Sequence, residues 1–133
     1  MFLSLEGINV LERNAGFIQI EREFLAPATK FIFISPEYNG SIPGVLKAMF
    51  DISDIQADWW GKKALLTGVS TGRAGNLRGM EHLTGILHYL KMIVHPDKIP
   101  ISSVDKLMDA DGNFTDAGTL ETIQEQLDQF IAF

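Results

Sequence analysis

The stretch Phe31–Ala48, FIFISPEYNGSIPGVLKA, decides how this chain folds. It opens with Phe31–Ile34, a continuous apolar, aromatic and β-branched run that is typical of a strand buried on both faces of a parallel sheet. Pro36 cannot donate to a sheet ladder, and Pro43 suits the start of a helix, where a missing N–H costs nothing. We therefore predict a strand, a fixed loop and then a helix that starts near Pro43. In open α/β sheets, ligands bind at loops in this position.

The loop carries groups that suit a flat, hydrogen-bonding heterocycle. Glu37, Tyr38, Asn39 and Ser41 supply an acid, an aromatic face, an amide and a hydroxyl around Gly40. The same residues are compatible with a simple turn at Asn39-Gly40 and a packing role for Tyr38. The residues alone leave both interpretations open.

A second segment of the same kind lies downstream. Ala64–Val69 predicts another buried strand, and the loop that follows, Ser70–Asn76, is rich in glycine and hydroxyl groups. A helix begins directly after this loop, so backbone N–H groups at its positive end would suit an electron-rich edge of a ligand. A plain strand-to-helix turn is the alternative interpretation.

Two motifs carry a family resemblance. Pro36–Lys47, PEYNGSIPGVLK, resembles the signature of the NADPH-dependent FMN reductase family, a flavodoxin-like group that includes quinone and azo-dye reductases. Ser70–Gly75 with Leu77-Arg78 is similar to the family's next flavin-contacting loop. The resemblance implies an oxidoreductase that passes hydride from NADPH or NADH to bound FMN and then to a small acceptor.

The resemblance also implies which residues would hold the flavin. Its ring or ribityl chain would meet Pro36, Glu37, Tyr38, Asn39 and Ser41, and its pyrimidine edge would meet backbone donors at Ser70, Thr71, Gly72 and Gly75. Neither loop contains a histidine or a lysine suited to acid–base chemistry, so we assign no catalytic residue.

The alternation of strands and helices predicts an α/β fold with a parallel sheet. The resemblance implies a flavodoxin-like three-layer αβα arrangement, in which the strands at Phe31, Ala64 and Met92 match the third, fourth and fifth of the family. We find no match to the first strand or its phosphate loop, so we expect an N-terminally truncated fold that holds FMN less tightly. The Phe31 strand would then be an edge that drives formation of a homodimer or homotetramer. The alternative function is a non-catalytic remnant or an oligomerising interaction module.

The composition is that of an ordinary globular protein. The 133 residues are 46% hydrophobic and 21% charged, and we expect a single domain over residues 1–133. The net charge of −6 argues against a sequence-independent grip on nucleic acid. Because the chain has no cysteine, no apparent leader and no membrane-spanning run, we expect a cytoplasmic protein without a membrane partner.

Apolar periodicity predicts the remaining elements. We expect a short strand at Phe2–Leu5, a helix from about Val10 to Leu25 with Glu21 on its polar side, and a C-terminal helix capped by Thr115 or Asp116. The residues predicted to face the core on the three later helices are Val45, Leu46, Met49 and Phe50; Leu77, Met80, Leu83, Leu87 and Leu90; and Leu120, Ile123, Leu127, Phe130 and Ile131.

Three further features have competing interpretations. Of the adjacent Trp59 and Trp60, at least one is expected to line a pocket or a subunit contact, or else to cover the core. A third strand region, Ile93–Ile101, is interrupted by His95-Pro96. The histidines are spaced too widely for a helical metal site, so we predict structural or surface roles for His82, His88 and His95, and we assign no metal.

Overall fold

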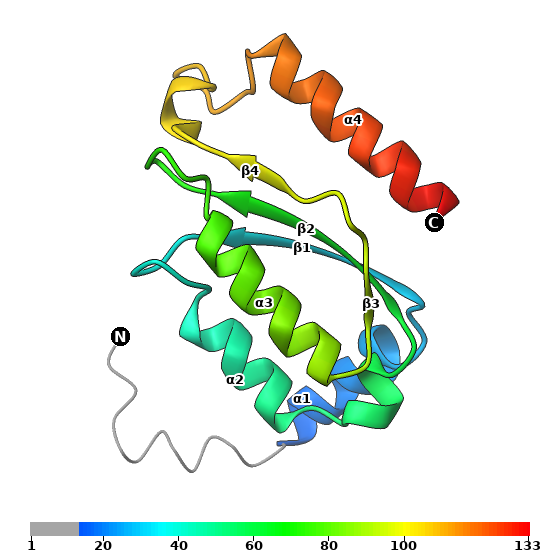
Figure 1. Cartoon of the computed structure of the whole chain (residues 1–133). Coiled ribbons are helices and arrows are strands. Elements are labelled where there is room, and N and C mark those ends of the chain that lie inside the picture. The colour runs from blue at the N-terminus through cyan, green and yellow to red at the C-terminus, as the bar shows by residue number, and fades with distance from the viewer. Residues whose placement is uncertain (1–13) are drawn as a thin grey trace.

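The computed structural model describes residues 14–133, which form a parallel sheet with helices on both faces (Figure 1). Strand β1 (Lys30–Pro36) pairs along its whole length with β2 (Lys63–Val69). On its other side β2 pairs with β3 (Ile93–Val94) and then β4 (Ile99–Ile101). This arrangement confirms the predicted α/β fold. The strand expected at Phe2–Leu5 and the start of the first helix lie outside the described residues.

The sheet forms the middle of three layers, with helices on each side. Helices α2 (Gly44–Ile52) and α3 (Leu77–Tyr89) lie side by side on one face, and α4 (Ala117–Ala132) lies on the other (Figure 1). The core between the sheet, α2 and α3 includes Phe33, Phe50 and Leu66, with Trp59 completely buried among them. Trp60 is 45% exposed and lies under the Lys91 ammonium group, so only one of the two indoles enters the core.

Strand β1 is covered on one face only, so the prediction of burial on both faces was wrong. Phe33 and Ser35 are buried against α2 and α3, whereas Ile32 is 51% exposed and Ile34 is 69% exposed on the opposite face. Helix α4 packs over β4 and β2 and leaves most of this face of β1 open. Within residues 14–133, β1 is also an edge strand, as predicted.

The predicted burial of apolar residues on the helices is right at the centre of each face and wrong at its margins. Phe50, Met80, Leu83, Leu87, Leu90 and Phe130 are buried, but Val45, Leu77, Leu120 and Ile131 are between 46% and 76% exposed. A helix lying on a flat sheet buries a narrow stripe, so apolar residues at the edge of the stripe remain in solvent. On α4 the buried stripe instead includes a polar residue, Gln126.

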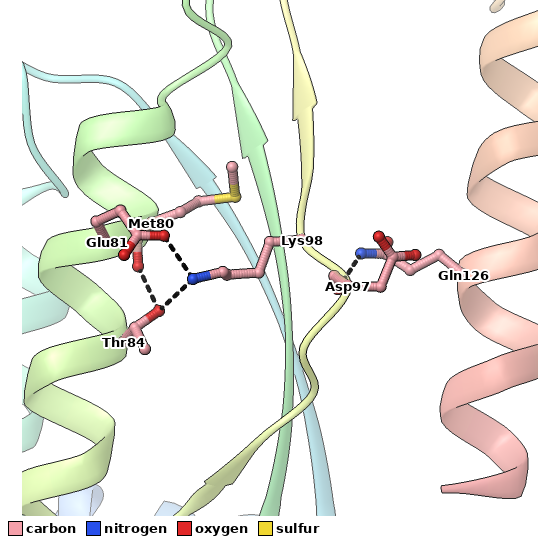
Figure 2. Close-up of polar contacts among 6 residues, drawn as sticks. All are labelled: Met80, Glu81, Thr84, Asp97, Lys98 and Gln126. Carbon is pink, nitrogen blue, oxygen red and sulfur yellow. Dashed lines mark hydrogen bonds and ion pairs between the residues drawn. The ribbon is translucent and has the colours of Figure 1, made fainter.

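Gln126 supplies hydrogen bonds where the third strand region is interrupted between β3 and β4. The register shifts by two residues between the Ala64–Val94 pair and the Thr67–Ile99 pair, so the ladder beside β2 is interrupted. The Gln126 amide donates to the carbonyl of Leu66 at 3.2 Å and to the carbonyl of Asp97 at 3.0 Å, in place of ladder donors. On the other side of the sheet, Lys98 bonds to Glu81 and Thr84 of α3 (Figure 2). The interrupting segment is therefore held from both helical layers.

The helical segment at the start of the described residues contains a buried acid, Glu21. Helix α1 (Ala15–Ile20) continues into a π-helical turn, η2 (Glu21–Leu25), which packs on a second one, η3 (Ile55–Trp59). Glu21 is only 3% exposed, which corrects its predicted position on a polar face. The N–H of Asp54 donates to both Glu21 and Asp58, at 3.0 and 3.1 Å. Burial, followed by the hydrogen bond with Glu21 and its charge, raises the pKa of Asp58 to about 6.

Candidate functional site

The two loops singled out in the sequence lie side by side at one end of the sheet. The parallel pairing of Ser35 with Gly68 and of Pro36 with Val69 brings the carboxyl ends of β1 and β2 to the same edge (Figure 1). Between the loops is a cleft of about 540 Å³, within the range of small-molecule sites. The residues that line this cleft are Pro36, Glu37, Tyr38, Asn39, Gly40, Val69, Ser70, Thr71, Gly72 and Val104.

The first loop contains a tight turn that also lines the cleft. Tyr38 and Ser41 exchange two backbone hydrogen bonds, of 2.9 and 3.1 Å. Asn39 and Gly40 between them have φ angles of 53° and 77°, a conformation that asparagine and glycine adopt most readily. The predicted turn at Asn39-Gly40 is therefore confirmed, and it places Tyr38 and Asn39 in the lining of the cleft. The ring of Tyr38 is exposed, so the alternative packing role for it was wrong, and its contact with a flat ligand stays a prediction.

The second loop is held by the segment that follows β4. The N–H of Ser70 donates to the carbonyl of Ile101 at 3.0 Å, and the carbonyl of Ser70 accepts from Val104 at 3.1 Å. The N–H of Ser103 donates to the carbonyl of Gly72 at 3.0 Å. Val104 thereby becomes part of the cleft, and sequence reasoning missed it because nothing local marks a valine far along the chain.

Two of the nine predicted site residues, Ser41 and Gly75, do not line the cleft. A side chain at position 75 would meet Pro100 at 2.6 Å and Ile101 at 2.8 Å, and Gly75 has a φ of +55°. The Ser41 hydroxyl lies 2.7 Å from Nδ1 of His82 on α3. Ser41 and Gly75 thus link their own loops to the neighbouring parts of the fold, α3 and β4. Their direct contact with a ligand stays a prediction.

Asn76 joins the two loops from below, and no local pattern pointed to it beyond its place at the start of a helix. The side chain is fully buried, and its amide donates to the carbonyl of Ser35 at 2.9 Å. Its other side-chain polar atom, Oδ1, has no hydrogen-bond partner among residues 14–133 and lies where any side chain at Gly79 would clash. Asn76 therefore fixes the distance between the end of β1 and the start of α3.

The lining is suited to a flat, largely uncharged ligand. Its one carboxylic acid is Glu37, and it contains no lysine or arginine among the residues that the structure describes. Tyr38 is 62% exposed and offers an aromatic face. Within the described part of the chain, the backbone N–H groups of Thr71 and Gly72 donate to no protein acceptor, whereas that of Ser70 is already used. This donor set fits the ring of a flavin better than its phosphate.

Other kinds of site find less support in residues 14–133. No group of three or more histidine, cysteine, aspartate or glutamate side chains there is arranged to hold a metal ion. None of the helices in this range has the length and apolar character needed to span a membrane. A second cleft, of about 390 Å³, lies beside Glu21 and Asp58, away from the two loops.

Both loops fall within a stretch that matches a known protein family. The profile described as NADPH-dependent FMN reductase matches residues 21–106, which include both loops. The chain belongs to the NADPH-dependent FMN reductase family. Membership confirms the resemblance drawn from the two motifs, the predicted cofactors FMN and NAD(P)H, and the predicted class of FMN-dependent NAD(P)H oxidoreductases.

Individual members of the family agree with this assignment. A 2-hydroxy-1,4-benzoquinone reductase of a Burkholderia species is 28% identical over 141 residues, spanning 99% of this chain and 77% of that protein. An NAD(P)H-dependent FMN reductase of Pseudomonas aeruginosa is 38% identical over 111 residues, spanning 80% of this chain and 59% of that protein. A quinone reductase of Escherichia coli is 30% identical over 130 residues, spanning 92% of this chain and 69% of that protein.

Solved structures confirm the flavodoxin-like fold of these FMN reductases. The flavoenzyme NAD(P)H:acceptor oxidoreductase FerB of Paracoccus denitrificans superposes with a TM-score of 0.74 at 22% identity, over 99% of this chain and 74% of that one. The apo form of an NADH:FMN oxidoreductase, EMOB, gives a TM-score of 0.71 at 21% identity, over 92% of this chain and 64% of that one. The chain thus spans roughly three fifths to three quarters of the length of these relatives.

Proposed function

We propose that the cleft between the two loops binds the isoalloxazine ring of FMN, and that the chain uses NAD(P)H to reduce a small acceptor of the quinone class. The observation that carries the proposal is the meeting of the two motif loops around one cleft of suitable size. When bound, FMN supplies the hydride-accepting and electron-donating chemistry, while the protein provides orientation and electrostatics.

Each wall of the cleft has its own role in this proposal. Tyr38 offers an aromatic face to the ring, and the Asn39 side chain offers an amide for its polar edge. On the opposite wall, the N–H groups of Thr71 and Gly72 donate to the pyrimidine edge, where negative charge collects on reduction. For Ser41 and Gly75 we propose an indirect part, through the placement of these walls.

Flavin uptake tests the proposal directly. The purified chain is titrated with FMN and with riboflavin, and flavin fluorescence and retention through gel filtration are measured. Because the described lining has no basic side chain, we expect the two ligands to bind with dissociation constants within about tenfold of each other. Oxidation of NADPH in the presence of benzoquinone should then require added flavin. A chain that takes up neither ligand would instead be the non-catalytic remnant considered above.

We also propose that the chain forms a homodimer through the edge of β1. Ile32 and Ile34 lie on an exposed strand face, and edge strands of this kind pair readily with another strand. Antiparallel pairing of two copies about Phe33 would place Ile32 beside Ile34 of the partner subunit, so the surface is complementary to itself. Light scattering should report a dimer for the native chain and a monomer for Ile34→Lys. The control is Val45→Lys, which alters an exposed apolar residue on α2.

A cytoplasmic location is the last part of the proposal. The nicotinamide co-substrate of the proposed reaction is available inside the cell, so a cytoplasmic enzyme would have its reductant at hand. Fractionation of cells that express the tagged chain tests this assignment.

A further inference from the structure

We infer that His82 is a positioning residue of the cleft, because its hydrogen bond to Ser41 fastens the Tyr38–Ser41 turn to helix α3. Nδ1 of His82 lies 2.7 Å from Oγ of Ser41, although the two residues are 41 positions apart in the chain. This hydrogen bond joins two side chains of the protein and needs no ligand. Its consequence for flavin binding rests on the function proposed above.

The turn has few other means of support. Its remaining hydrogen bonds, between Tyr38 and Ser41, are internal to the turn. Tyr38 is 62% exposed, and a side chain added at Gly40 would meet no described atom within 4 Å, so nothing in residues 14–133 packs on the tip of the turn. Among residues 14–133, the contact with His82 is the only hydrogen bond that joins positions 38–41 to another element. The orientation of Tyr38 and Asn39 therefore depends on it.

Helix α3 is well suited to set this orientation. Its N-cap residue, Asn76, bonds to the carbonyl of Ser35 at the base of the first loop, and its first turn directly follows the second loop. Met80 and Leu83 anchor the helix in the core on either side of His82. His82 thus connects the outer end of the first loop to α3, the rigid element at which the second loop ends. Together, the contacts of Asn76 and His82 fix the spacing between the two walls of the cleft.

Ser41 and His82 can form their hydrogen bond with either residue as the donor. A serine hydroxyl both donates and accepts, and a neutral imidazole nitrogen does one or the other according to its tautomer. Either arrangement gives one hydrogen bond. Asparagine carries a polar atom at the same distance from the backbone as Nδ1 of histidine, whereas leucine has a similar size and no polar atom. These two replacements separate the hydrogen bond from the bulk of the side chain.

The experiment compares His82→Leu, His82→Asn and Ser41→Ala, with His88→Leu as control. His88 is exposed on the same helix, and within residues 14–133 no hydrogen bond joins its side chain to either loop. We expect His82→Leu and Ser41→Ala each to raise the dissociation constant for FMN about 3- to 10-fold, the effect of one lost hydrogen bond. His82→Asn should restore most of the affinity. The double variant should lose no more than either single variant, because both changes remove the same bond.

A second measurement does not involve flavin. Amide hydrogen exchange followed by NMR should be faster at the N–H groups of Tyr38 and Ser41 in His82→Leu, and unchanged at Leu66 in the centre of β2. Unchanged exchange at the turn, or losses of affinity that add in the double variant, would overturn the inference. If the native chain binds no flavin, the proposed function fails. The exchange rates at Tyr38 and Ser41 then decide by themselves whether His82 holds the turn.

Discussion

The backbone N–H of Glu37 donates to the carbonyl of Val69 at 2.9 Å, one step beyond the last paired residues of β1 and β2. This hydrogen bond continues the parallel ladder into the floor of the cleft. The two loops are therefore joined at their bases by sheet geometry, and they separate only beyond this point. A ligand held between them would rest on the most regular part of the fold.

Replacing Tyr38 should weaken flavin binding without affecting the fold. Its ring lines the cleft and is 62% exposed, so Tyr38→Ala removes an aromatic contact but little buried surface. We expect the dissociation constant for FMN to rise about 2- to 10-fold, the value of a typical aromatic stacking contact. Fluorescence titration measures it. Tyr89→Ala, which truncates an 81% exposed tyrosine at the far end of α3, should leave the affinity unchanged.

Replacing Gly75 should destabilise the protein and disturb the second loop. A Cβ atom at this position would lie 2.6 Å from the backbone of Pro100, and the φ of +55° is unfavourable for alanine. We expect Gly75→Ala to lower the free energy of unfolding by about 2 kcal/mol or more, as measured by urea denaturation. Gly85→Ala provides the matched control. Gly85 lies in α3, and no atom in the described part of the chain would contact the added Cβ within 4 Å, so this variant should raise stability by about 0.5 to 1 kcal/mol.

Asp58 should make stability depend on pH in an unusual direction. Its pKa rises from 3.8 to about 6 on folding, chiefly through burial and then through Glu21, so the folded state binds the proton more tightly. Asp54 adds a further negative charge, while Lys62 lies near enough to feel the charge of Asp58. The stabilising effect of the proton is therefore complete below about pH 4. This stabilisation is lost as the pH rises through about 6. Each tenfold difference in proton affinity between the folded and unfolded states changes the free energy of unfolding by about 1.4 kcal/mol.

The variant Asp58→Asn tests this pH dependence. Its amide reproduces the donor of the protonated acid, and it retains an oxygen to accept from Asp54. We expect the variant to be more stable than the native chain at pH 7 and to have a flatter stability profile between pH 4 and 6. Urea denaturation across this range measures both effects. Asp51→Asn, at an exposed carboxylate paired with Lys47, should keep the native profile, and a native profile in Asp58→Asn would contradict the assignment.

Gln126 should be important for stability, because its polar side chain is buried on the inner face of α4. Gln126→Leu would leave the carbonyls of Leu66 and Asp97 without their donor and Thr67 without an acceptor. We expect a loss of about 2 to 4 kcal/mol in the free energy of unfolding. Gln124→Leu, on the exposed side of the same helix, should change it by less than about 0.5 kcal/mol. Equal effects of the two variants would show that the bridge contributes nothing.

The sequence predicted the order of the elements better than their burial. The strands near Phe31 and Ala64 and the helix starts near Pro43 and Leu77 all agree with the structure, because apolar runs, prolines and glycines act on the backbone around them. Ile32 and Ile34 were expected inside and are exposed, and Glu21 was expected outside and is buried. Burial depends on which element lies opposite, and periodicity within one segment does not contain that information.

The sequence by itself determined the family, the α/β alternation and seven of the residues that line the cleft, because each of these is written in contiguous motifs at two strand ends. Only the tertiary structure decided that Val104 joins the lining, that Asn76 reaches Ser35 and that His82 holds Ser41. The physical reason is distance along the chain. These contacts join residues that only the pairing of β2 with β1 and β4 and the docking of α3 bring together.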